Sequence, residues 1–221
     1  MKQMRREEDN ISSKEIASLL LKIHAVIFDF KNPITFSSGV VSPVFIDDRL
    51  IISYPKIREI ILNKFLKIIK EEIGFKNVDV ISGTASAAIP HAALIAERLI
   101  LPMVYVRSRE KSHGKENKIE GVVRKKQKVV VIEDHISSGG SAINNVLTLR
   151  EAGTQVDNCL AITTYGLKTA KNLFKKHKIN LYTLTDFLTI VDVALKDGYI
   201  NTSKKNKLMF WFNNPVTWGF T

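Results

Sequence analysis

Residues 129–141 read Val-Val-Val-Ile-Glu-Asp-His-Ile-Ser-Ser-Gly-Gly-Ser. The apolar, mostly β-branched start predicts a buried strand over Val129–Ile132, and the acids, serines and glycines after it predict a loop. A helical pattern then runs from about Ser141 to Ala152. A strand, a loop of small residues and a helix, in this order, form the repeating unit of a parallel α/β sheet.

The same alternation continues on both sides of this unit. Further strands are expected at Val78–Ser82, Met103–Val106, Cys159–Thr163 and Leu181–Leu184, with helices between them. Because these strands lack polar alternation, helices should cover both faces of the sheet. We therefore expect an α/β fold, a Rossmann-like parallel sheet flanked by helices, as a core over residues 56–200. Residues 1–55 predict a helix and a small hood lobe, and residues 201–221 predict an aromatic tail that packs on the core or joins a dimer.

The glycine end of residues 129–141 suits a phosphate. Gly139 and Gly140 let the backbone approach a ligand closely, and Ser137, Ser138 and Ser141 add hydroxyl donors. The N–H groups of the helix that follows would point into the loop, and such an arrangement binds phosphate dianions. The loop has neither the Gly-Lys-Ser/Thr of a P-loop nor the Gly-x-Gly-x-x-Gly of a dinucleotide site.

The two acids before the glycines, Glu133 and Asp134, would be repelled by a phosphate. They suit hydroxyl groups beside the phosphate, or a divalent cation. A ligand with a phosphate at one end and a diol at the other is a ribose 5-phosphate. The alternative is an acidic helix cap followed by a flexible turn, which the order of strand, two acids and Gly-Gly disfavours.

Two further loops follow strands and carry features that bind anions. Residues 107–121 place Arg107, Lys111 and His113 in a long polar loop, which predicts either a lid over a multiply charged anion or a solvated basic loop. Residues 82–91 place small side chains, Thr84 among them, before a helix, which predicts a second anion pocket. In an open parallel sheet, such loops meet at the carboxyl ends of the strands.

The composition narrows the class of protein. The 221 residues carry 33 Lys and Arg against 22 Asp and Glu, and the net charge of +11 attracts nucleic acid or phosphorylated small molecules. The single cysteine, Cys159, cannot form an internal disulfide and is expected to be a small core residue in a reducing compartment. Because we find no apolar run of membrane-spanning length and no signal peptide, we expect a cytoplasmic protein.

Three segments together resemble the orotate phosphoribosyltransferases, which are type I phosphoribosyltransferases. Residues 129–141 are similar to the phosphoribosyl pyrophosphate motif of that family. Residues 107–114, Arg-Ser-Arg-Glu-Lys-Ser-His-Gly, are similar to its mobile catalytic loop, although Ser108 stands where some members have a second Lys. Residues 35–55, with a Ser-Gly, a Ser-Pro and a Ser-Tyr-Pro, resemble a segment typical of the orotate enzymes. The resemblance runs from about residue 36 to residue 186.

The resemblance implies the type I phosphoribosyltransferase fold and a Mg²⁺-dependent reaction of pyrimidine (UMP) biosynthesis. In this reaction the 5-phosphoribosyl group moves from phosphoribosyl pyrophosphate to orotate, giving orotidine 5′-monophosphate and pyrophosphate. Lys111, His113 and Asp134 would be catalytic. Phosphoribosyl pyrophosphate would contact Arg107, Lys111, His113, Glu133, Asp134, His135, Ile136, Ser137, Ser138, Gly139, Gly140, Ser141 and Thr84. The resemblance also implies a homodimer whose subunits share loop residues. Mg²⁺ would be held mainly by substrate phosphates and water, with no protein ligands.

The base-binding residues are expected in the hood lobe. Because orotate is a planar anion, its pocket should offer an apolar wall and donors for a carboxylate. Phe36 and Phe45 could form the wall, while Arg49 and Ser137 could supply the donors. The alternatives are core packing for the two phenylalanines and a surface ion pair for Arg49.

Two other functions stay open at this point. One is a purine phosphoribosyltransferase, which the segment from Phe36 to Tyr54 disfavours. The other is a regulator that senses phosphoribosyl pyrophosphate while it binds nucleic acid, which the net charge of +11 favours and the presence of Lys111 and His113 disfavours. We expect binding neither to membranes nor to nucleic acid.

Overall fold

The structure, a computed structural model, describes residues 13–36, 39–107, 118–215 and 217–218. The chain forms two compact units, one of Ile52–Leu184 and one of Met1–Ile51 together with Thr185–Thr221. The domain boundaries expected from the sequence, after residues 55 and 200, stay a prediction. Within the described residues, no helix has the length and apolar character needed to cross a bilayer.

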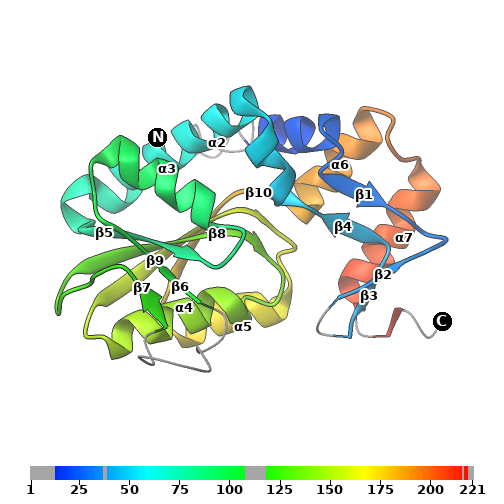
Figure 1. The fold of residues 1–221 in the computed structure, drawn as a ribbon. Helices are drawn as coiled ribbons and strands as arrows, with labels where there is room; N and C mark the ends of the chain where they lie inside the picture. The colour runs from blue at the N-terminus through cyan, green and yellow to red at the C-terminus, as the bar shows by residue number, and fades with distance from the viewer. Residues whose placement is uncertain (1–12, 37–38, 108–117, 216, 219–221) are drawn as a thin grey trace, which may run out of the picture. The chain divides into compact units, whose positions relative to one another are not determined.

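A six-stranded sheet forms the centre of the Ile52–Leu184 unit, in the order β10-β9-β8-β5-β6-β7 (Figure 1). Strand β5 pairs in parallel with β6 and β8, β8 pairs in parallel with β9, and β6 pairs antiparallel with β7. The strands are β5 (Val80–Thr84), β6 (Met103–Val106), β7 (Ile119–Glu120), β8 (Lys128–Ile136), β9 (Gln155–Thr164) and β10 (Asn180–Asp186). The expected α/β fold with a mostly parallel sheet is therefore confirmed.

Helices cover both faces of this sheet, as the unbroken apolar strands predict. Figure 1 shows α2 (Pro55–Ile68) and α3 (Ile89–Leu99) on one face, and α4 (Gly140–Glu151) and α5 (Lys168–Lys176) on the other. Helix α2 continues into a π-helix, η2 (Ile69–Gly74), and a short 3-10 helix, η3 (Phe75–Asn77). Cys159 is fully buried in the cluster that α4 and α5 form with the sheet, which confirms it as a core residue.

Strand β8 is longer than its sequence predicts. The expected strand ends at Ile132, whereas β8 continues through both acids to Ile136. The added residues pair with β9, Glu133 opposite Ala161 and His135 opposite Thr163. Local propensity disfavours acids in a strand, but pairing with a buried neighbour overrides it. Both acids are therefore part of strand β8, and the loop begins at Ser137.

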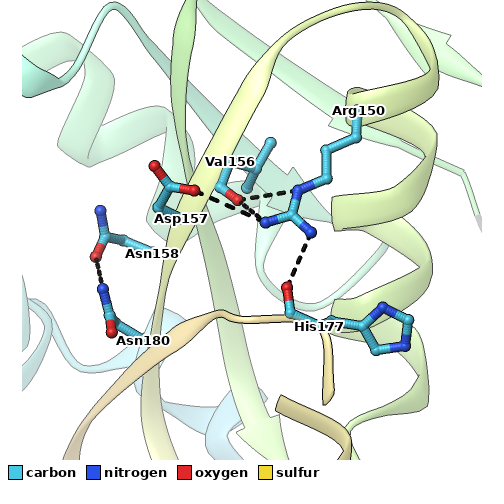
Figure 2. Close-up of polar contacts among 6 residues, drawn as sticks. All are labelled: Arg150, Val156, Asp157, Asn158, His177 and Asn180. Carbon is cyan, nitrogen blue, oxygen red and sulfur yellow. Dashed lines mark hydrogen bonds and ion pairs between the residues drawn. The ribbon is translucent and has the colours of Figure 1, made fainter. Parts of the chain in front are cut away.

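Arg150 anchors the C-terminal end of α4 to two other elements (Figure 2). Its guanidinium donates to the carbonyl of Val156 at 3.1 Å and to that of His177 at 2.9 Å. Asp157 lies 3.8 Å from the same group, and nearby Asn180 donates to Asn158 at 3.1 Å. The far end of the helix is thus fixed to β9 and to the end of α5, which restrains the position of its N-terminus.

The other unit contains a helix over residues 13–22 and two small antiparallel sheets. Strand β1 (Val26–Phe28) pairs with β4 (Val44–Ile46), and β2 (Ile34–Thr35) pairs with β3 (Val41–Ser42). A 3-10 helix, η1 (Asp48–Ser53), lies at the unit's boundary, and α6 (Phe187–Lys196) and α7 (Thr202–Asn213) complete it.

Two aromatic side chains of α7, Trp211 and Phe212, pack inside this second unit, whereas Phe210 is exposed. Trp211 is fully buried, and its Nε1 donates to the carbonyl of Val41 at 2.9 Å. Its ring meets that of Phe187 edge-on at 5.5 Å, and Phe212 stacks on the same Phe187 at 5.2 Å. These two members of the expected aromatic tail therefore pack against α6 and β3.

Candidate active site

A cavity of about 250 Å³ lies where β5 and β6 end and α4 begins. Its lining residues are Thr84, Ala85, Val106, Arg107, Gly140, Ser141, Asn144 and Asn145. Four of these, Thr84, Arg107, Gly140 and Ser141, are among the residues expected to contact phosphoribosyl pyrophosphate. The carboxyl ends of parallel strands are where open α/β sheets bind their ligands.

The N-terminus of α4 presents backbone donors to this cavity. Gly139 is the N-cap in a left-handed conformation, φ 83°, and the first helical hydrogen bond runs from the Ile143 N–H to the Gly139 carbonyl at 3.1 Å. The N–H groups of Gly140 and Ser141 precede that bond and have no partner within the helix. Because the positive end of the helix dipole adds to these donors, this wall suits a phosphate group.

Arg107 adds a cation to the lining of the cavity. Its backbone N–H donates to the Lys118 carbonyl at 2.9 Å, and its half-buried guanidinium forms an ion pair with Glu120 on β7. A guanidinium matches the oxygens of a phosphate with two parallel donors. Lys111 and His113, the other cations expected here, lie outside the described residues.

The two acids of β8 differ in burial. Glu133 is only 5% exposed, whereas Asp134 is half-buried. Burial raises the pKa of Glu133 well above its usual range, and the neighbouring Asp134 raises it further. Hydrogen bonds from the Asp134 N–H, at 3.1 Å, and from Thr84 lower the same pKa. Within the described part of the chain neither acid has a salt bridge, so both carboxylates can accept hydrogen bonds from hydroxyl groups.

The side chains of His135 and Ile136 face the protein interior. His135 Nδ1 lies 2.7 Å from Thr163 Oγ1, its ring meets Tyr165 edge-on at 4.5 Å, and burial lowers its pKa to about 4. Ile136 is buried, and its carbonyl accepts from the Tyr165 N–H at 3.0 Å. Ligand contacts expected from these two residues would therefore come from their backbone. Those expected from Ser137, which is half-buried, and from Ser138, which is exposed, stay predictions.

The residues expected to bind orotate belong mostly to the other unit. Phe36 is half-buried, and its N–H donates to the Val40 carbonyl at 2.9 Å. Phe45 lies on β4 opposite Ile27. Arg49 is exposed and grips Asp47 with two bonds of 2.6 and 2.8 Å, as expected for a surface ion pair. Their role in orotate binding stays a prediction.

Sequence reasoning missed Asn144 and Asn145, which line the cavity. Asn145 is 1% exposed and lies on the buried side of α4 with Ala142 and Leu149. A polar residue at an apolar position of a helix is a detectable signal, because its burial requires hydrogen-bond partners. Ser82, whose Oγ donates to Asn145 Oδ1 at 3.1 Å, is equally buried, and for it the sequence indicates only a loop of small residues.

Comparisons with known proteins identify the family. Residues 53–197 match the model of the phosphoribosyl transferase domain. The orotate phosphoribosyltransferase of Coxiella burnetii is 46% identical over 92% of this chain and 97% of its own length. The crystal structure of the orotate phosphoribosyltransferase from Aeropyrum pernix superposes with a TM-score of 0.72 at 28% identity, covering 84% of this chain and 99% of that one. The UMP synthase of Leishmania donovani superposes with a TM-score of 0.77 at 25% identity; the match covers 91% of this chain but 42% of that longer protein. The chain therefore belongs to the phosphoribosyltransferase family and, within it, to the orotate phosphoribosyltransferases.

Proposed function

We propose that this protein transfers the 5-phosphoribosyl group from phosphoribosyl pyrophosphate to orotate, releasing pyrophosphate and orotidine 5′-monophosphate. The observation that carries the proposal is the cavity formed by the α4 N-terminus, the end of β5 and Arg107. It offers donors for a phosphate and a cation for a pyrophosphate in one pocket. The names of the curated relatives favour orotate over a purine as the acceptor.

The reaction needs groups of opposite charge around the sugar ring and around the leaving group. As the bond to pyrophosphate breaks, the sugar ring gains positive charge and the leaving group gains negative charge. Glu133 and Asp134 accept hydrogen bonds from the ribose hydroxyls, and Asp134 offsets the charge on the ring. Arg107 neutralises the leaving pyrophosphate, and the sequence motif of Lys111 and His113 assigns them the same task.

We assign Mg²⁺ to the substrate and to water rather than to a protein cage. Mg²⁺ commonly keeps several waters and binds through phosphate oxygens. Bound in that way, it would neutralise charge on the pyrophosphate and leave Glu133 and Asp134 to the ribose hydroxyls.

An absorbance assay tests the function directly. The protein, mixed with orotate, phosphoribosyl pyrophosphate and Mg²⁺, should consume orotate, and hypoxanthine or adenine should not replace it. Lys111→Ala should nearly stop turnover and leave the melting temperature unchanged. Preferred consumption of a purine base would refute the choice of orotate.

We also propose that the protein is a homodimer whose sites share residues, with Lys111 of one subunit acting at the Glu133 of the other. Lys111→Ala and Glu133→Gln subunits should each be inactive alone. Once mixed and reassembled, half of the dimers should contain one intact site, which restores about a quarter of the wild-type activity. No recovery in verified mixed dimers would show that each site is built from one chain. The expected cytoplasmic location rests on the sequence.

A further inference from the structure

Three polar side chains lie buried beside the cavity, and two of them, Ser82 and Asn145, have no role in the function proposed above. Ser82, Thr84 and Asn145 are 0%, 6% and 1% exposed. Burying such groups costs free energy unless each finds a hydrogen-bond partner. Thr84 and Asn145 also line the cavity, so the arrangement reaches the site itself.

The three side chains form a chain of hydrogen bonds with one direction. Ser82 Oγ donates to Asn145 Oδ1 at 3.1 Å, and Asn145 Nδ2 donates to Thr84 Oγ1 at 3.0 Å. A threonine hydroxyl carries a single proton. Because Asn145 donates to the Thr84 oxygen, the Thr84 proton remains available for another acceptor.

The acceptor beside Thr84 is Glu133. In the parallel pair of β5 and β8, Gly83 lies opposite Ile132, so the next residues, Thr84 and Glu133, are neighbours. Side chains alternate along a strand, so Thr84 shares its face with Val80, and Glu133 shares its face with Val131. Val80 and Val131 both belong to the core cluster under α4, so Thr84, Glu133 and Asn145 meet on the same side of the sheet.

We propose that Asn145 is a positioning residue for the transfer reaction, which acts through Thr84 to hold the Glu133 carboxylate ready to accept a ribose hydroxyl. The inference rests on the proposed function, in which Glu133 binds the ribose. Glu133 is almost fully buried, and burial favours its neutral form. A donor with a fixed direction favours the ionised form, and Asn145 supplies that direction by occupying the Thr84 oxygen.

Few other titratable groups face Glu133 within the described residues. Asp134 is adjacent on β8, and Cys159 on β9 is a buried thiol whose pKa burial raises well above its usual range. Strand β5 contributes no titratable side chain. On α3, His91 interacts with Asp134, and on α4, Arg150 is bonded to carbonyls at the opposite end of the helix. A change at Asn145 or Thr84 should therefore alter the pKa of Glu133 directly, because no other titratable group of the described chain lies between these residues and Glu133.

The pH profile of kcat/KM for phosphoribosyl pyrophosphate separates positioning from simple structural support. Its acidic limb should report the ionisation of Glu133 in the free enzyme. Asn145→Leu releases the Thr84 hydroxyl, and Thr84→Val removes it. Both should raise the pKa of Glu133 and move the limb to higher pH, and kcat/KM below the limb should fall about tenfold for each pH unit that the limb moves. Thr84→Ser keeps the hydroxyl and should keep the wild-type limb.

The outcomes distinguish the possible failures. Equal loss at every pH in Asn145→Leu and Thr84→Val, or identical profiles for Thr84→Val and Thr84→Ser, would overturn the inference. A ¹³C NMR titration of the Glu133 carboxyl, assigned with Glu133→Gln, gives the same comparison without substrate. If Asn145→Leu does not fold, the two Thr84 variants still decide the question. If the wild-type protein does not consume orotate, the proposed function fails, whereas an unchanged Glu133 pKa in variants of an active enzyme sinks only this inference.

Discussion

Replacing Gly139 with alanine should lower both the stability of the protein and its affinity for phosphoribosyl pyrophosphate. Gly139 caps α4 with φ at 83°, a conformation that L-residues rarely adopt. A methyl group at this position would also lie 2.8 Å from Cε2 of Phe174. Phe174 is 3% exposed and packed in the core cluster, so its ring has little room to move away.

The size of the effect follows from the backbone strain and the clash together. The left-handed conformation costs about 1–2 kcal/mol for a residue with a Cβ. Overpacking against the Phe174 ring adds about 1–3 kcal/mol. The lower entropy of the unfolded alanine chain offsets about 0.4–1 kcal/mol. The net loss of about 1–4.6 kcal/mol is smaller than the usual stability of about 5–15 kcal/mol, so the variant should still fold.

Gly198 offers a matched control. Its φ is 80°, and nothing lies within 4 Å of an added Cβ, so Gly198→Ala tests the backbone strain without the clash. Urea denaturation should place the midpoint of Gly139→Ala clearly below that of Gly198→Ala. Only Gly139→Ala should also raise the KM for phosphoribosyl pyrophosphate, because it displaces the N–H groups of α4. Equal midpoints and unchanged KM values in the two variants would refute this account of the loop.

Three further predictions concern single side chains. Arg107→Ala should lower kcat/KM by about 10²–10³-fold, by analogy with the loss of an oxyanion-hole donor. The control Arg98→Ala, which removes an exposed ion pair with Glu59, should leave kcat/KM unchanged. Similar kinetics in the two variants would exclude Arg107 from the site. Burial lowers the pKa of His135 to about 4, whereas the pKa of an unfolded histidine is about 6.5. The unfolded state therefore takes up a proton first as the pH falls, and the free energy of unfolding decreases between about pH 6.5 and about pH 4. His135→Gln should show a smaller fall between pH 7 and pH 5 in urea titrations, and an unchanged fall would contradict the assignment. Arg150→Met removes the bonds to the Val156 and His177 carbonyls and should cost about 1–3 kcal/mol in denaturation, against less than about 1 kcal/mol for Asp157→Asn, whose carboxylate is exposed and 3.8 Å away; equal losses would show that the carbonyl bonds contribute little.

The features that the sequence predicts well are local in the chain. The unit of strand, glycine loop and helix around residues 129–152 needs only contiguous residues, and β8 and α4 are where it places them. The end of β8 is different, because Glu133 and His135 join the strand through partners on β9. Those partners lie about 28 residues away in the chain, as the contact between His135 and Thr163 shows. Single-residue propensity carries no information about such pairing.

The base-binding residues mark another limit of sequence reasoning. The chemistry of Phe36, Phe45 and Arg49 suits a planar anion, but residue chemistry alone does not determine where these side chains lie in the fold. The structure gives Arg49 a bidentate partner, Asp47, whose pKa the hydrogen bond from Arg49 lowers. Because the Arg49 guanidinium is already paired with Asp47, it must either release Asp47 to bind orotate or bind orotate while Asp47 stays in place. Asp47→Asn therefore separates the two, because it should strengthen orotate binding if Asp47 competes and weaken it if Asp47 orients Arg49.

The buried bridge from Ser82 to Asn145 shows why part of the site stays hidden in the sequence. The two residues are 63 positions apart, and their bond exists only because β5 and α4 meet with one rotation and one register. Taken alone, Ser82 suggests a loop of small residues and Asn145 suggests a polar position on a helix. What reveals them is the cost of burial, since a buried amide at an apolar helix position must have partners. Here the second hydrogen bond of the Asn145 amide goes to Thr84 on the wall of the cavity. The need to give a buried amide its hydrogen-bond partners therefore also fixes the orientation of a side chain in the site.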